Sequence, residues 1–161
     1  MPADHVVKHA DAFARAVAAG LEHAVAGKVV TFGIVPHSPH TGFGYIRGGA
    51  AVAAAARALE LFVEKPDRAR ARRYLKRGGY LWNSGVFVWT ARAILEEIQA
   101  HAPKVHRALA PLRRAGGGRG AWKQAMEVAY RRAPSAPIDT AVLESSRRVW
   151  CRRVRSGCWM E

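Results

Sequence analysis

The sequence has few acidic residues, few cysteines and no long apolar runs. Of its 161 residues only 12 are Asp or Glu, against 26 Lys and Arg, so the formal net charge is +14. This excess indicates an anionic partner, and nucleic acid, a membrane surface and phosphorylated small molecules all carry such charge. The charge alone does not choose among these three classes.

The cysteines and the apolar residues exclude two further classes of protein. Cys151 and Cys158 lie close together near the end of the chain and make no disulfide framework of the kind found in small secreted domains. No run approaches the roughly 20 apolar residues of a membrane span, and Asp4 and His5 stand where a signal peptide would be apolar. We therefore expect a reduced, cytoplasmic protein with incidental thiols and no membrane partner.

Motifs that bind phosphate chains or nucleic acid are also missing. The GGGRG run at 116–120 lacks the Lys-Ser/Thr ending of a P-loop and follows no predicted strand, so it is interpreted as a flexible turn. The basic segment 67–77 has no interleaved stacking aromatics apart from Tyr74. We favour a solvated helix there, with Asp67 as its N-cap. A basic nucleic-acid-binding module stays as the alternative from a different class.

Apolar periodicity predicts several elements. Within residues 9–26, four apolar residues follow one another at intervals of four positions. This spacing predicts a helix that ends at Gly27. Residues 28–34, KVVTFGI, are β-branched and aromatic and predict a strand, followed by a Pro-rich loop. A helical segment is expected over about 91–133. There, the stripe of Trp122, Met126 and Tyr130 is interpreted as core packing.

Two polar clusters adjoin predicted strands and are the best candidates for a site. In FVEKPD at 62–67, Pro66 favours extended geometry at Lys65, so Glu64 and Lys65 are expected at a strand end, where α/β proteins usually place their chemistry. In WNSG at 82–85, an amide, a hydroxyl and a side-chain-free backbone come just ahead of an apolar strand. We predict that the two clusters form two walls of one pocket.

These motifs carry a resemblance to a known family. FVEKPD and YLWNSGVF, with PADH at 2–5, VVTFGIVPHSPHTGFGYI at 29–46 and PIDTAVLES at 137–145, resemble the mannose-1-phosphate guanylyltransferases, nucleotidyltransferases with a glycosyltransferase-A-like fold. The resemblance implies a partial Rossmann-like α/β domain with a mixed sheet flanked by helices. The family's Gly-rich nucleotide-binding loop is not found, so residues 1–161 are interpreted as one partial catalytic domain, the sugar-phosphate-binding half, without the N-terminal half.

The resemblance implies a reaction as well. GMP would pass from GTP to mannose 1-phosphate, giving GDP-mannose and pyrophosphate, while Mg²⁺ offsets charge on the phosphates. We expect this chain alone to be a truncated, inactive fragment, with an exposed sheet edge that favours homo-oligomers. Other sugar-1-phosphate nucleotidyltransferases are the near alternative, and a non-catalytic remnant that retains the fold is another. Residues 137–145 would buttress the site, and residues 147–161 would form a further strand.

The resemblance assigns roles only to residues at positions that match the family's motifs. The resemblance assigns Lys65 to the sugar phosphate, as a catalytic and binding residue, and assigns Glu64 and Asn83 to sugar hydroxyls. Gly44 would contact the sugar through its backbone.

The resemblance assigns the metal to two carboxylates. Asp4 holds the position of a metal-binding Asp, although Asp is also a favoured helix N-cap. Glu161 stands where a second such Asp is expected. His37, His40 and Phe43 replace the Thr, Glu and Tyr that are common in the family, so side-chain contacts from that loop are not carried over.

Overall fold

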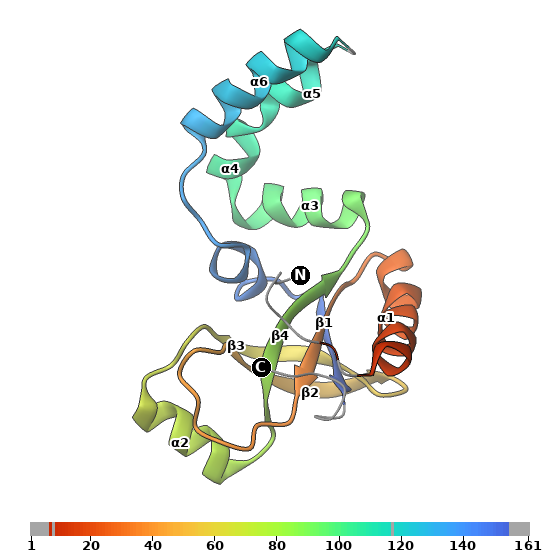
Figure 1. Cartoon of the computed structure of the whole chain (residues 1–161), viewed down its shortest axis with the longest axis vertical. Helices are drawn as coiled ribbons and strands as arrows, with labels where there is room; N and C mark the ends of the chain where they lie inside the picture. Colours follow the sequence, from red (N-terminus) through yellow and green to blue (C-terminus); the bar gives the residue numbers. More distant parts are fainter. Residues whose placement is uncertain (1–6, 8, 117, 155–161) are drawn as a thin grey trace. The chain divides into compact units, whose positions relative to one another are not determined.

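The computed structural model describes residue 7 and residues 9–116 and 118–154 of the chain. The described residues up to Ala93 and from Arg147 onward form one compact unit, here called the barrel unit. Ile94–Ser146 form the other, the helical unit (Figure 1).

The strands of the barrel unit form a closed barrel in the order β1-β4-β2-β3-β5. They are β1 (Val29–Ile34), β2 (Tyr45–Ala53), β3 (Ala56–Val63), β4 (Tyr80–Val88) and β5 (Val149–Val154). β1 and β5 are parallel, and the other neighbouring strands are antiparallel. The predicted mixed sheet is confirmed. The predicted exposed edge is wrong for these strands, because β5 pairs with both β1 and β3.

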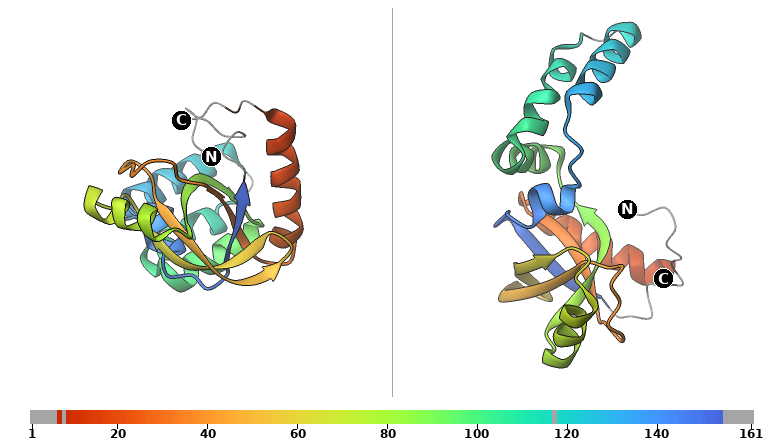
Figure 2. Two further views of the ribbon diagram at one scale, coloured as in Figure 1. Left: turned by 90° about the horizontal axis from the view of Figure 1, so that it is seen from below. Right: turned by 90° about the vertical axis from the view of Figure 1, so that its left-hand side faces the viewer.

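Helix α1 (Ala10–Val25) packs on the outside of the barrel (Figure 2). Phe13, Ala16 and Val17 lie against a buried cluster that includes Val30 and Phe32. The helix predicted for residues 9–26 is therefore confirmed. Only the first half of its apolar stripe is covered, because Leu21 is 52% and Val25 71% exposed.

The alanine-rich segment between the predicted loop and FVEKPD forms the β2–β3 hairpin. Ala55 makes the turn with a φ of 57°, in the left-handed region. Alanine has the highest helix propensity, so local preference gave no indication of strands here. Ile46 and Phe62, which pair across the hairpin, are buried together with Cys151 of β5. The pairing of β2 with β3 and of β3 with β5 therefore overrides the local preference of this segment.

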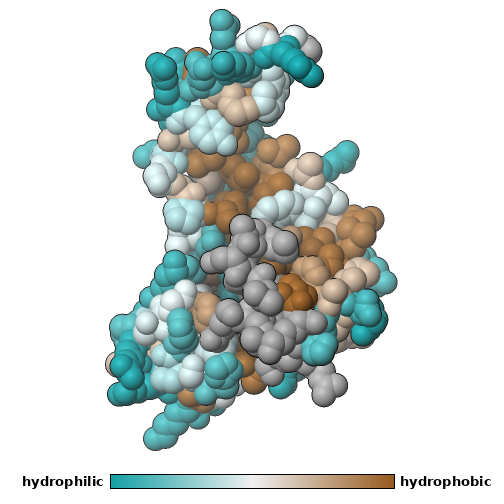
Figure 3. Space-filling model, viewed as in Figure 1, coloured by the Kyte–Doolittle hydropathy of each residue, from teal (hydrophilic) through white to brown (hydrophobic). Residues whose placement is uncertain are grey.

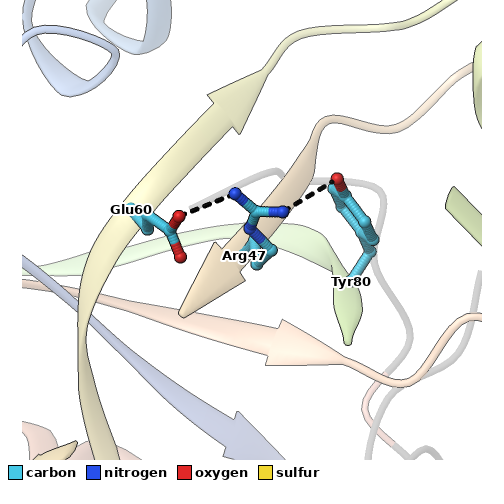
Figure 4. A network of polar contacts seen from close by, with 3 residues as sticks. All are labelled: Arg47, Glu60 and Tyr80. Atoms are coloured by element: carbon cyan, nitrogen blue, oxygen red, sulfur yellow. Dashed lines mark hydrogen bonds and ion pairs between the residues drawn. The ribbon is translucent and has the colours of Figure 1, made fainter. Parts of the chain in front are cut away.

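Arg47 of β2 connects the strands on either side of it (Figure 4). Its Nη2 lies 2.7 Å from Glu60 Oε1 on β3, and its Nη1 donates to the Tyr80 hydroxyl on β4 at 3.4 Å. The guanidinium also lies over the Tyr80 ring, 5.5 Å from its centroid. Glu60 is half exposed, so the ion pair alone adds little stability. The contacts nevertheless tie together the three strands that deliver the candidate site residues.

Cys151 is a buried, free thiol in β5. Burial raises the pKa of the Cys151 thiol, so it stays neutral and is a poor nucleophile. This agrees with its interpretation as an incidental thiol. Cys158 lies outside the described residues.

The helical unit begins within α3 (Ala91–His101). It also contains α4 (Pro103–Ala108), α5 (Ala110–Arg114), α6 (Arg119–Arg132) and a π-helical turn, η1 (Asp139–Leu143). Trp122 is 48% and Tyr130 73% exposed, whereas Ala129 is buried. The predicted core stripe on α6 is therefore wrong. Hydrophilic residues dominate the α5–α6 end on the face shown in Figure 3, and all but one of the charged residues of α5 and α6 are basic.

None of the described helices is both long and apolar enough to span a bilayer.

Candidate functional site

The predicted residues Gly44, Glu64 and Asn83 come together in the barrel unit. Gly44 directly precedes β2, Glu64 directly follows β3, and Asn83 lies in β4, which neighbours β2. A Cβ added to Gly44 would lie 2.7 Å from Glu64 Oε2 and 3.5 Å from Asn83 Cβ. Gly44 is therefore in direct contact with both polar clusters, and no larger residue fits there without moving Glu64.

The WNSG motif forms a bulge within β4, not a segment ahead of the strand as predicted. Thr31 of β1 pairs with Phe87, but Gly33, two positions on, pairs with Asn83, so β4 has extra residues between these pairs. Gly85 takes a left-handed φ of 66°, and the Ser84 hydroxyl accepts from the Val86 N–H at 3.3 Å. Bulges redirect side chains and are frequent beside active sites. The motif thus sets the direction of Asn83.

Two hydrogen bonds hold Asn83 in place. Its backbone N–H donates to the Gly44 carbonyl at 2.7 Å, and its Oδ1 accepts from the Thr31 hydroxyl at 2.7 Å. Thr31 is fully buried in β1. Because Oδ1 faces Thr31, the N–H donors lie on the other edge of the planar amide. Thr31 was not identified from the sequence, although it is the one hydroxyl in the apolar run of residues 29–34.

Glu64 lies between Gly44 and Lys65. Its Oε2 approaches Gly44, and its Oε1 lies 3.5 Å from Lys65 Nζ. The Glu64 side chain is 28% exposed and that of Lys65 is 64% exposed, so the ammonium group extends into solvent beside the carboxylate. The pair offers a hydrogen-bond acceptor and a cation side by side.

The extended geometry predicted for Lys65 is wrong, because Lys65 has a φ of 41°. Asp67 N-caps α2 (Arg68–Arg77), accepting from the Arg70 N–H at 2.7 Å, so Lys65 lies in the short connection between the end of β3 and this cap. A non-glycine residue in the left-handed region carries about 1–3 kcal/mol of strain. Such strain is often kept where it places a functional group.

The predicted metal ligands, Asp4 and Glu161, lie outside the described residues. Among the residues that are described, no group of three or more His, Cys, Asp and Glu side chains is arranged to hold a metal ion. Among the described residues, Glu64 brings its carboxylate to the Gly44–Asn83 contact. The described residues therefore do not provide a ligand set for Mg²⁺.

Comparisons with known proteins identify the family of the chain. A family model named Nucleotidyl transferase matches residues 1–127. The xanthan biosynthesis protein XanB of Xanthomonas campestris pv. campestris is 41% identical over 146 residues, which cover 91% of this chain and 31% of XanB. Mannose-1-phosphate guanylyltransferase RfbM of Salmonella typhimurium is 45% identical over 108 residues, covering 67% of this chain and 22% of RfbM.

A solved structure matches in three dimensions. The crystal structure named mannose-1-phosphate geranyltransferase from Thermus thermophilus superposes with a TM-score of 0.81 at 38% identity, covering 96% of this chain and 43% of that one. The chain thus spans about a third or less of the curated relatives it matches. The resemblance to mannose-1-phosphate guanylyltransferases is confirmed, and the chain belongs to the nucleotidyl transferase family.

Proposed function

We propose that this chain supplies the mannose 1-phosphate-binding part of a guanylyltransferase that makes GDP-mannose and pyrophosphate from GTP and mannose 1-phosphate. The observation that carries the proposal is the contact of Gly44 with both Glu64 and Asn83, in a chain whose relatives include mannose-1-phosphate guanylyltransferases. A sugar 1-phosphate presents hydroxyls and a phosphate to the protein. In this chain a hydrogen-bond acceptor (Glu64), a donor (Asn83) and a cation (Lys65) lie beside one another.

Each side chain suits one part of such a substrate. The Glu64 carboxylate accepts from sugar hydroxyls, and the Asn83 amide, oriented by Thr31, donates to a sugar oxygen. The Lys65 ammonium is a compact cation on a flexible stem and suits the phosphate. Its partial neutralisation of the phosphate would let a phosphate oxygen approach the α-phosphorus of GTP. Catalysis of this kind consists mainly of positioning and electrostatic stabilisation.

Two parts of the proposal rest on the resemblance alone. Asp4 and Glu161 are proposed as Mg²⁺ ligands, and a bound Mg²⁺ would offset negative charge on the phosphates. GTP is proposed as the second substrate, in the cytoplasm. The near alternative, another sugar 1-phosphate, has the same chemistry and is distinguished by titrating glucose 1-phosphate in parallel.

A titration tests the function directly. We expect the purified chain to bind mannose 1-phosphate in a calorimeter without GTP, because Gly44, Glu64, Lys65 and Asn83 all belong to one compact unit. We expect no GDP-mannose or pyrophosphate when GTP and Mg²⁺ are added to the chain alone. Absence of mannose 1-phosphate binding by a folded chain would refute the assignment. Binding to nucleic acid that falls steeply with added salt would favour the basic-module alternative.

Replacing Lys65 should separate phosphate recognition from backbone strain. Lys65→Met removes the charge and is expected to weaken mannose 1-phosphate binding about threefold to tenfold, while free mannose binding changes little. Lys65→Gly removes the charge and also relieves the left-handed strain, a net gain of up to about 1 kcal/mol in unfolding free energy. Both variants should therefore lose phosphate affinity equally and differ in denaturation midpoint. Equal losses for mannose and mannose 1-phosphate would show that Lys65 does not recognise the phosphate.

A further inference from the structure

Residues 35–44, the loop between β1 and β2, contain a histidine that contacts the loop itself and the first residue of β2. The Gly42 N–H donates to His40 Nδ1 at 3.0 Å. The His40 carbonyl accepts from the Tyr45 hydroxyl at 2.9 Å. The His40 ring stacks on Phe43 with 4.4 Å between centroids and 26° between planes. The carbonyl and the ring of one residue thus fix the segment that ends at Gly44.

The contacts of His40 continue to the candidate site. Tyr45 is fully buried in β2, so its hydroxyl gives the His40 carbonyl a rigid partner. Gly44 lies between Tyr45 and Phe43, and its carbonyl is bound to the Asn83 N–H. A Cβ on Gly42 would lie 2.8 Å from His40 Cε1, so the turn closes tightly on the imidazole. The 40–43 turn and Gly44 are therefore held by one continuous set of contacts.

We propose that His40 is a positioning residue, which holds Gly44 in the place where its backbone meets a bound sugar phosphate. The proposal rests on the proposed function for the identity of the ligand. His40 acts through the backbone of residues 41–44, which connects it to Gly44. The required chemical feature is an acceptor at Nδ1, which only an imidazole carrying its proton on Nε2 provides.

Asparagine is the substitution that separates the acceptor from the ring. An Asn side-chain oxygen accepts from the N–H two residues on, as in an Asx turn, and so replaces Nδ1 in the bond to Gly42. Phenylalanine keeps a ring to stack on Phe43 and has no acceptor. The comparison of His40→Asn with His40→Phe thus isolates the hydrogen bond, and His37→Phe serves as the control in the same loop. His37 lies edge-on to Trp82, with 4.8 Å between centroids, so phenylalanine preserves the shape of that contact.

The experiment measures mannose 1-phosphate affinity of the full chain by calorimetry. We expect His40→Phe to bind about threefold to tenfold more weakly than the unsubstituted chain, which is the effect of one neutral hydrogen bond. His40→Asn and His37→Phe should stay within about twofold of it. Equal affinity in His40→Phe and His40→Asn, whether both are weakened or both unchanged, would overturn the proposal.

A second readout does not depend on the ligand. In nitrogen-resolved NMR spectra, neutral His40 should carry its proton on Nε2, and the Gly42 and Gly44 amide signals should move in His40→Phe and return toward their original positions in His40→Asn. A proton on Nδ1, or unchanged Gly44 signals in His40→Phe, would contradict the role of His40. If the unsubstituted chain does not bind mannose 1-phosphate, the proposed function fails, while these spectra still decide whether His40 holds Gly44.

Discussion

Glu64→Ala is expected to weaken mannose 1-phosphate binding about tenfold to a hundredfold, because a hydrogen bond to a charged group contributes about 1.5–3 kcal/mol. Glu60→Ala is the matched control. Glu60 is also a carboxylate of the β3 segment with a basic partner, Arg47, but no described contact joins it to Gly44 or Asn83. We expect the control to bind as the unsubstituted chain does. Calorimetry on both variants, with circular dichroism to verify folding, measures the difference.

Substitutions of Asn83, the other polar residue in contact with Gly44, also test the sugar-phosphate site. Asn83→Ala would leave the buried Thr31 hydroxyl without its Oδ1 partner, so a loss of binding could be a loss of stability. Asn83→Asp keeps an acceptor for Thr31 and removes the amide donors. We therefore expect Asn83→Asp to remain folded and to bind about as weakly as Glu64→Ala. Unchanged affinity in both Glu64→Ala and Asn83→Asp would remove these residues from the sugar-phosphate site.

Features of the fold that depend on neighbours in sequence were predicted correctly. The β-branched run at 28–34, the apolar spacing at 9–26 and the Asp67 cap are each determined within a few residues, and each matches β1, α1 or α2. Features that depend on distant partners were not. Barrel closure requires β1 to pair with β5, more than a hundred residues away in the sequence. The alanine-rich hairpin forms strands through the pairing of β2 with β3 and of β3 with β5, against its local preference.

In the candidate site, too, features set by neighbours in sequence were predicted and features set by distant partners were missed. Glu64, Lys65 and Asn83 were singled out because polar residues beside apolar strands are conspicuous in sequence, and the structure places Glu64 and Asn83 against Gly44. The left-handed φ of Lys65 was missed because the rule for residues before proline describes the local preference alone. Thr31 and His40 were missed as positioning residues because their partners, Asn83 and Tyr45, are identified only by the fold.

Gly33→Ala is expected to destabilise the barrel unit by about 1–3 kcal/mol, the usual cost of an overpacked core. Gly33 is buried in β1 and pairs with Asn83. An added Cβ would clash with Leu81 Cδ1 and would lie 2.8 Å from Leu81 Cβ and 3.2 Å from Ile46 Cδ1. Leu81 Cδ1 can move by a change of rotamer, but Leu81 Cβ is fixed to the β4 backbone. β1 and β4 must therefore separate locally, at the residues that orient Asn83.

A control variant and a double variant test whether these contacts cause the expected loss of stability. Gly120→Ala is the control, because nothing lies within 4 Å of its added Cβ and alanine favours the helix α6. Leu81→Ala in the Gly33→Ala background removes the contact to Cδ1 and leaves the one to Cβ, so the strain is relieved only in part. Urea denaturation of the four chains gives the unfolding free energies, and calorimetry gives mannose 1-phosphate affinity under native conditions. We expect Gly33→Ala to lose both stability and affinity. Full stability in Gly33→Ala would show that β1 and β4 accommodate a methyl group there, and weakened affinity at full stability would place the effect on the direction of Asn83 alone.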